Sequence, residues 1–319
     1  MHARRVLLIG GGGFIGRALG RRLAASGCEV HALSRHVEPG RRGDVEFHRG
    51  SQAETAVVAP LLARCDSVVH LASTTTPGRS AHAPALEMRE NLEPLADFLE
   101  LLAAAAPRRI LYLSSGGAIY GNPPFLPATE EHPVQPLSWH AAGKVAAEEF
   151  LRTHARQISG TSLAILRPAN VYGPGQPLQA GFGFVRTLME KARSGEPVEI
   201  WGDGRQVRDF LYIDDLVDAC LRLLDVILVQ RIDRPQLTKQ VFAQFETVVD
   251  RCRLRQIEQR SREEKILGAE IDATDQVGFV FALGQQPGLG ARCAALGEHE
   301  HRRATSIGLE PCIGMDRQE

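Results

Sequence analysis

Short apolar runs and longer amphipathic segments alternate along roughly the first 225 residues of the chain. The short runs have the length of buried strands, and the longer segments repeat apolar residues at helical spacing. The expected strands are Val6–Ile9, Glu29–Leu33, Val45–His48, Ser67–Leu71, Arg109–Leu113 and Ser162–Leu166. The expected helices are Phe14–Ala25, Ala53–Arg64, Ala85–Ala105, Ser138–His154 and Phe182–Arg193. This order predicts an α/β fold with a doubly wound parallel sheet of the Rossmann type and a small C-terminal substrate lobe.

The pattern divides the chain into three regions. Residues 1–175 are expected to form a dinucleotide-binding domain, and residues 176–225 a segment of the substrate lobe together with returning elements of the sheet. From residue 226 to residue 319 the alternation stops, and one amphipathic helix over Val241–Cys252 is the only periodic element. After about residue 285 the chain is rich in Gly, His and Arg, and no packed structure is predicted. This region is either a diverged lid or an unrelated terminus that leaves the substrate pocket incomplete.

A glycine-rich turn follows the first strand, in Gly10-Gly11-Gly12-Gly13-Phe14-Ile15-Gly16. Three of these glycines are spaced three apart, so they can form a tight turn, let the backbone approach a pyrophosphate and let the next helix pack closely. The phosphates would lie on the helix N-terminus, where free N–H groups and the helix dipole favour negative charge. The turn therefore predicts a dinucleotide site.

Composition narrows the class of protein. The 319 residues are 44% hydrophobic and 24% charged, with a formal net charge of −1, so we expect no nucleic-acid or membrane partner. The apolar run after Arg4-Arg5 is too short for a secretory signal and leads directly into the glycine turn. Six cysteines are scattered without metal-ligand spacing, which predicts free thiols, a cytoplasmic location and no metal site.

Further segments follow the glycine turn in a fixed order. They are His70-Leu71-Ala72, Asn91, Ser114–Gly121, Lys144, Arg167–Gly175 and Gly202–Asp215. Together with the turn they resemble the extended short-chain dehydrogenases/reductases, and among these the NAD-dependent epimerase/dehydratase family that acts on nucleotide sugars. The resemblance covers about residues 4 to 225.

The resemblance implies roles for matching residues. The cofactor would be held by Gly10, Gly13, Phe14, Ile15, Gly16, Leu71, Ala72, Asn91 and Lys144. In the family the lysine contacts the nicotinamide ribose and lowers the pKa of a neighbouring acid/base. Asn170 would begin the substrate side of the cleft, and Arg208 would reach the nucleotide diphosphate as a bidentate donor.

The chain departs from the family at its catalytic positions. Four residues before Lys144, where the family has its tyrosine, stands His140. The position of the family's catalytic serine or threonine is occupied by Gly116, with the hydroxyl of Ser115 one residue away. A neutral imidazole can accept a proton from a sugar hydroxyl, so the predicted catalytic residues are His140, Lys144 and Ser115, and the alternative is a silent site.

Cofactor preference depends on the end of the second strand. Enzymes that use NAD usually carry an acidic residue there, whereas this chain has Ser34-Arg35. A hydroxyl beside a guanidinium suits a 2′-phosphate, which favours NADP, although Arg35 could also be an exposed loop charge.

The sequence thus predicts an NAD(P)-dependent nucleotide-sugar epimerase-like oxidoreductase or isomerase that acts through a transient 4-keto sugar. The alternatives are a reductase or dehydratase of the same family and a cofactor-binding protein without turnover. A homodimer is also expected, because the helices around Ala85–Ala105 and Trp139–Leu151 match the family's dimer helices, and Leu92, Leu95, Leu99 and Leu102 form an apolar stripe.

Overall fold

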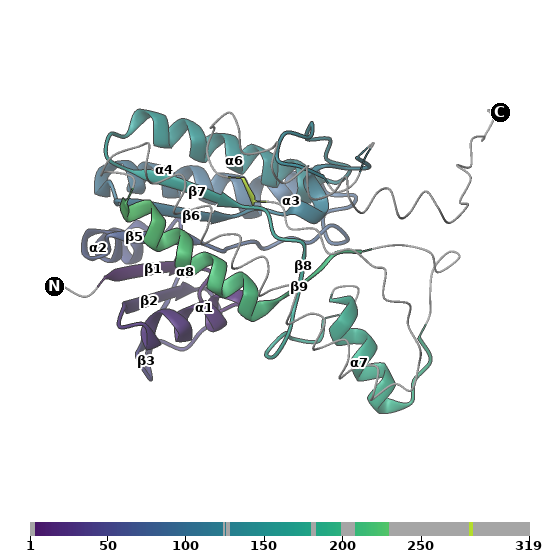
Figure 1. Ribbon diagram of the computed structural model, residues 1–319. Coiled ribbons are helices and arrows are strands. Elements are labelled where there is room, and N and C mark those ends of the chain that lie inside the picture. The colour runs from purple at the N-terminus through teal and green to yellow at the C-terminus, as the bar shows by residue number, and fades with distance from the viewer. Residues whose placement is uncertain are drawn as a thin grey trace.

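The computed structural model describes residues 4–123, 125, 128–179, 183–198, 208–229 and 281–282. Its centre is an eight-stranded sheet in the order β10-β7-β6-β5-β1-β2-β4-β3 (Figure 1). The strands are β1 (Arg5–Ile9), β2 (Glu29–Ser34), β3 (Gly40–Arg42), β4 (Val45–Arg49), β5 (Ser67–His70), β6 (Arg109–Leu113), β7 (Ser162–Leu166) and β10 (Phe281–Ala282). Strands β7, β6, β5, β1, β2 and β4 are parallel, and β10 and β3 pair antiparallel at the two edges. The predicted doubly wound parallel sheet is confirmed.

Helices cover both faces of this sheet (Figure 1). On one face lie α1 (Phe14–Ala25) and α8 (Ile213–Val229), whose apolar side chains share one buried cluster. On the other lie α2 (Thr55–Arg64), α4 (Glu93–Ala105) and α6 (Trp139–Gln157), which build a second cluster. The central strands are buried on both sides, which explains why Val6–Ile9 is apolar throughout instead of alternating.

A small lobe lies to one side of the main sheet (Figure 1). It contains the parallel pair β8 (Asn170–Tyr172) and β9 (Phe210–Tyr212) and the helix α7 (Phe184–Ser194). The ring of Phe184 stacks on that of Phe210, with 6.1 Å between their centroids, and so connects α7 to β9. The sequence boundaries proposed for the lobe stay a prediction.

The predicted helix over Ala85–Ala105 is interrupted. It consists of α3 (Pro84–Glu87), a π-helical turn η1 (Met88–Leu92) and then α4. Pro94 has no N–H, so the carbonyl of Glu90 lacks its normal helical donor, and the wider turn accommodates this loss. Such π-turns often occur at functional sites. A further short helix, α5 (Gly116–Ile119), follows β6.

The apolar stripe on this helix has a different role from the one expected. Leu92, Leu95 and Leu102 are buried against the chain's own sheet, and Leu99 packs beside them. The stripe therefore belongs to the core and does not present a dimer face. A homodimer would have to use another surface.

Two other predictions concern the C-terminal region and the membrane. Helix α8 continues to Val229, beyond the predicted boundary, and Phe281–Ala282 adds an edge strand. The helix expected over Val241–Cys252 and the end of the chain after residue 285 lie outside the described residues. Among the described helices, none combines the length and the apolar character needed to cross a membrane.

Candidate functional site

The glycine turn after β1 makes backbone contacts that a side chain would prevent. Gly10 has a φ of +83°, in the left-handed region that favours glycine. A Cβ at Gly10 would lie 2.8 Å from the backbone nitrogen of Ala72, and one at Gly16 would lie 2.6 Å from Cα of Gly11. The turn therefore packs directly against the chain after β5, and α1 packs directly against the turn.

The N-terminus of α1 is suited to bind an anion. Gly13 is its N-cap, Phe14 and Ile15 are its first helical residues, and the first intrahelical bond runs from Arg17 N to Gly13 O at 3.0 Å. The first turn of α1 contains no acidic residue, and the cap has no side-chain hydrogen bond. The amide groups that open this helix are thus left for a ligand with negative charge.

A cleft of about 230 Å³ lies beside this turn, at the carboxyl ends of the parallel strands. Seven of the residues predicted to bind the cofactor line it: Gly10, Gly13, Ser34, Arg35, Leu71, Ala72 and Asn91. The fold therefore gathers residues from the ends of β1, β2 and β5 and from η1 into one site, although they are far apart in the sequence.

The guanidinium of Arg35 already has partners across this cleft. Its Nη1 lies 3.5 Å from Oε2 of Glu90, and its Nη2 donates to Oγ1 of Thr74 at 3.0 Å. Both side chains of the ion pair remain partly exposed, so the pair is open to exchange with a ligand. The predicted contribution of Arg35 to cofactor choice must therefore compete with Glu90.

His140 belongs to a buried hydrogen-bonded cluster that the sequence analysis did not foresee. Its Nδ1 lies 3.1 Å from Oγ1 of Thr75, which in turn lies 2.5 Å from Oε2 of Glu87. Nδ2 of Asn91 donates to Thr75 Oγ1 and to Glu87 Oε1, both at 2.8 Å, and Oδ1 of Asn91 accepts from the backbone N–H of Thr74. Because Thr74 and Asn91 line the cleft, the cluster adjoins the dinucleotide site.

These contacts are consistent with one assignment of donor and acceptor to each hydrogen bond. Thr75 has a single hydroxyl proton, which it donates to the Glu87 carboxylate, and its oxygen accepts from Asn91. The remaining lone pair of Thr75 accepts from Nδ1–H of His140. In this tautomer Nε2 of His140 is the proton acceptor.

Lys144 lies one helical turn after His140, on the same face of α6. Its Nζ donates to the carbonyl of Leu113 at 3.0 Å and lies 5.1 Å from the ring centroid of Tyr112. Burial lowers the pKa of Lys144 to about 8, against the opposing effect of Glu87 and Glu148. Burial, and after it the charge of Lys144, lowers the pKa of His140 to about 4, so the imidazole is neutral at neutral pH.

The structure explains the glycine at the family's hydroxyl position. A Cβ at Gly116 would overlap the carbonyl oxygen of Arg167, so a serine there requires the backbone to move. Ser115 is the N-cap of α5 but makes no side-chain capping bond. The hydroxyl of Tyr120 accepts from Nη1 of Arg167 at 2.6 Å, and burial raises its pKa. Tyr120 is thus part of a structural network with Arg167.

Of the predicted substrate residues, Asn170 lies on the small sheet and Arg208 lies two residues before its strand β9. Asn170 opens β8 and pairs in register with Phe210, two residues after Arg208. The side-chain amide of Asn170 donates to the carbonyl of Asp209 at 2.9 Å. The fold therefore brings Asn170 next to the segment that carries Arg208.

A glycine turn at a helix N-terminus, a cleft at the ends of parallel strands and buried acid–base groups beside it define a nucleotide-binding α/β enzyme. The family described as the NAD dependent epimerase/dehydratase family matches residues 6–231. The chain belongs to this family.

Similar proteins differ in their reactions. The chain is 35% identical to a UDP-glucose 4-epimerase of Mycolicibacterium smegmatis over 228 residues, which cover 68% of this chain and 72% of that protein. It is 31% identical to a dTDP-4-dehydro-6-deoxy-D-allose reductase of Streptomyces bikiniensis over 242 residues, covering 70% and 73% of the two chains. A solved structure of Thermus thermophilus UDP-glucose 4-epimerase in complex with NAD superimposes with a TM-score of 0.62 at 32% identity, covering 68% and 73%. These relatives share the family and not a single reaction.

Proposed function

We propose that this protein is a nucleotide-sugar epimerase-like oxidoreductase in which His140 is the catalytic acid/base. The observation that carries the proposal is the hydrogen-bonded series from His140 through Thr75 to the Glu87 carboxylate. Relatives named as a UDP-glucose epimerase and a dTDP-sugar reductase support a nucleotide-sugar substrate.

The proposed proton transfer uses both ring nitrogens of His140. Nδ1–H keeps its hydrogen bond to Oγ1 of Thr75, which fixes the tautomer of His140. Nε2 then accepts the proton of the reacting sugar hydroxyl. The resulting imidazolium is stabilised by the negative charge of Glu87 through Thr75. Glu87 and Thr75 are therefore positioning residues, and burial, aided by the Lys144 ammonium, keeps His140 neutral before the transfer.

The residues around the glycine turn fit a dinucleotide cofactor. The space that Cβ atoms would fill at Gly10 and Gly16 lets the backbone approach the pyrophosphate, and the amides of Phe14 and Ile15 would meet its charge. Leu71, Ala72, Asn91 and Lys144 would lie on the nicotinamide side. When bound, the nicotinamide supplies a hydride acceptor for the sugar carbon, which yields the transient 4-keto sugar.

For the adenosine end we propose that Ser34 and Arg35 accept a 2′-phosphate, so that NADP binds at least as well as NAD. The two residues line the cleft, and the guanidinium exchanges its contact with Glu90 for the phosphate. The NAD named in the Thermus thermophilus complex is the other candidate.

Asn170 would begin the substrate side of the cleft, and Arg208 would bind the nucleotide diphosphate. Residues 176–225 would supply a segment of the substrate lobe together with returning elements of the sheet. The place of Asn170 on β8 and of Arg208 just before β9 supports this assignment. A guanidinium suits a diphosphate because it stays charged and donates in a fork.

The deciding experiment is incubation of the full chain and NAD or NADP with UDP-glucose or UDP-galactose, with products followed by NMR. We expect interconversion at C4, and a loss of about two to four powers of ten in rate for His140→Ala. Thr75→Val should lose activity and Thr75→Ser should keep it, because only serine preserves the hydroxyl relay. Activity in the wild type that is unchanged in His140→Ala would refute the proposal. Net reduction or dehydration instead of epimerisation would identify the related reactions.

One observation favours a second candidate, a cofactor-binding protein without turnover. Gly116 is held against Arg167 O, so the family's usual hydroxyl is both absent and sterically excluded. This candidate predicts cofactor binding with no turnover of any nucleotide sugar in the wild type. It also predicts that His140→Tyr does not create activity, whereas the enzymatic proposal expects His140→Tyr to retain or raise it.

We also propose that the protein is a cytoplasmic homodimer. The described cysteines Cys28, Cys65 and Cys220 are free thiols, which suits a reducing compartment. Trp139 and Phe150 are each 48% exposed on one side of α6, and they replace the buried leucine stripe as the basis for a dimer face.

A further inference from the structure

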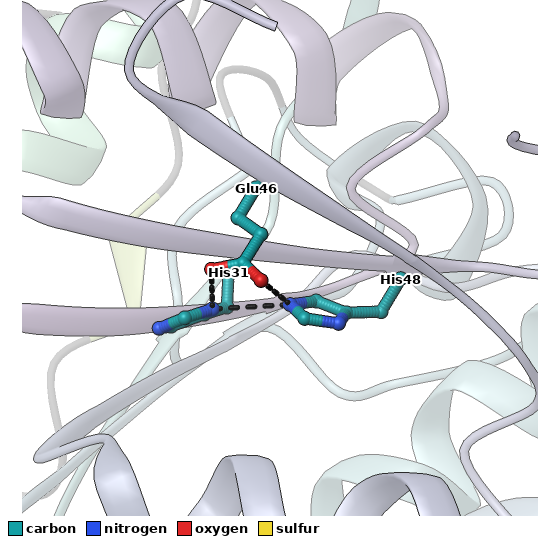
Figure 2. A group of neighbouring side chains, drawn as sticks. All are labelled: His31, Glu46 and His48. Carbon is teal, nitrogen blue, oxygen red and sulfur yellow. Dashed lines mark hydrogen bonds and ion pairs between the residues drawn. The ribbon is translucent and has the colours of Figure 1, made fainter. Parts of the chain in front are cut away.

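Three potential metal ligands meet on the sheet, apart from the residues of the proposed reaction. They are His31 on β2 and Glu46 and His48 on β4, as Figure 2 shows. The strand register places His31 directly opposite Glu46, and His48 lies two residues further along the same face. The convergence is therefore built into the backbone pairing.

The three ligand atoms have the separations of a metal coordination sphere. Nδ1 of His31 lies 3.0 Å from Nε2 of His48 and 3.4 Å from Oε2 of Glu46. Nε2 of His48 lies 4.0 Å from Oε1 of Glu46. Metal bonds of about 2.0–2.2 Å at tetrahedral angles place neighbouring ligand atoms about 3.3–3.5 Å apart. A small rotation of the half-exposed Glu46 carboxylate brings its two separations into this range. A shift of a few tenths of an ångström in the His48 ring does the same for the two imidazole nitrogens.

The second nitrogen of His31 provides an independent indication. Its Nε2–H donates to Oε1 of Glu29 at 3.1 Å, and Glu29 is also paired with Arg64 at 3.5 Å. With this N–H directed at Glu29, the neutral imidazole has its lone pair on Nδ1, facing His48 and Glu46. Metal-bound histidines almost always donate their other N–H to such a carboxylate.

Exposure gives the cluster an open side. The side chain of His31 is fully buried, whereas those of His48 and Glu46 are 21% and 41% exposed. An ion can therefore enter from solvent and keep a water as its fourth ligand. Two imidazoles and one carboxylate suit zinc and similar transition metals, whereas calcium and magnesium prefer oxygen ligands alone.

We propose that His31, Glu46 and His48 form a site for a first-row transition-metal dication, with Zn²⁺ as the best match. The ion would link β2 to β4 shortly before these strands reach the cleft, where Ser34 and Gly50 line the cofactor site. It would stabilise the folded chain by binding there and not in the unfolded state. When no metal is bound, Nε2–H of His48 donates to Nδ1 of His31 instead.

The test is titration of the chelator-treated full chain with Zn²⁺ against a chromophoric competitor, with Co²⁺ absorption as a second readout. We expect one equivalent to bind, a Co²⁺ spectrum with nitrogen and oxygen ligands but no thiolate charge-transfer band, and a higher thermal unfolding midpoint with Zn²⁺. Glu29→Gln should weaken binding by about 10–100-fold, the usual effect of losing an outer-shell partner. His48→Gln and Glu46→Gln should weaken it more.

The matched control is His82→Gln, because His82 is an exposed histidine outside the cluster. It should bind Zn²⁺ as the wild type does. Equal binding by the wild type and Glu46→Gln, a thiolate band with Co²⁺, or no stoichiometric binding would overturn the proposal. Glu46 is partly exposed, so Glu46→Gln decides the question even if His48→Gln does not fold.

Discussion

The carboxylate of Glu87 fills the space next to Gly143 that a side chain on α6 would occupy. A Cβ built at Gly143 would overlap Oε1, Cγ and Cδ of Glu87. Glu87 is nearly fully buried, and it holds its position through Thr75 and Asn91. Because Gly143 has no side chain, Glu87 has the space to hydrogen-bond with Thr75.

Replacing Gly143 by alanine should change the stability in the direction opposite to the usual one for a glycine in a helix. Gly→Ala within a helix ordinarily stabilises a protein by about 0.5–1 kcal/mol. We expect Gly143→Ala to lower both the thermal unfolding midpoint and the turnover rate, because Glu87 must leave Thr75. Gly78→Ala, where the added Cβ meets nothing within 4 Å, is the control. A higher midpoint for Gly143→Ala, measured by circular dichroism, would contradict this account.

The pKa values of the two helix residues predict a wide pH range for activity. His140 must be neutral and Lys144 charged, so the rate should fall below about pH 4 and above about pH 8. An ordinary histidine would instead lose activity below about pH 6.5. Initial rates across this range, at pH values where circular dichroism shows the folded state, measure both limbs. An acid limb near 6.5 would show that His140 is not shifted.

Stability should depend on pH with a definite sign. Between pH 6.5 and about 4, His140 is protonated in the unfolded chain but stays neutral in the folded chain. Acidification over this range therefore favours unfolding. The protonation of His140 in the unfolded chain should lower the free energy of unfolding by about 2 kcal/mol at pH 5. Urea unfolding at pH 7.5 and pH 5 measures the difference. His140→Gln should lose this part of the pH dependence, and an identical dependence in both proteins would disprove the assignment.

Cofactor preference should change in opposite directions for the two members of the ion pair across the cleft. Arg35→Ala should weaken NADP binding selectively by about 1–3 kcal/mol, because it removes a charge-assisted contact. Glu90→Gln should strengthen it, because Arg35 no longer has a competing partner. Titration of both cofactors by fluorescence checks the pair. Strong NAD preference that neither substitution changes would rule out the 2′-phosphate role.

The proposed dimer face on α6 can be tested at a single exposed position. Phe150→Glu places a charge on this apolar surface and should convert the dimer into a monomer without unfolding it. Met189→Glu is the control, because Met189 is 64% exposed on α7. Sedimentation at micromolar concentration gives the result, and a monomeric wild type would refute the dimer itself.

Most strands of the sheet could be predicted because each is indicated by a short run of neighbouring residues. Each central parallel strand is buried on both faces, so Val6–Ile9 and Ile110–Leu113 appear as short apolar runs between amphipathic helices. The glycine turn could be predicted from consecutive residues, although the close approach of Ala72 to Gly10 depends on the fold. The π-turn was missed because one residue, Pro94, interrupts an otherwise regular helical pattern.

The site could be predicted only in part, because its decisive contacts are between distant residues. Thr75 and His140 are 65 positions apart, and no short motif joins them. One signal was present: Glu87 lies four residues before Asn91, so both could share a helical face. The contact of Arg35 with Glu90 and the meeting of His31 with Glu46 likewise depend on strand order and register.

The short strand β3 limits how this protein can associate. Gly40–Arg42 is exposed along its whole length, and Arg42 lies over the ring of Phe47 on the neighbouring strand. A brief, positively charged edge repels a second edge of the same kind, and three residues offer few hydrogen bonds to an incoming chain. Self-assembly by continuous sheet extension is thus discouraged at this end of the sheet.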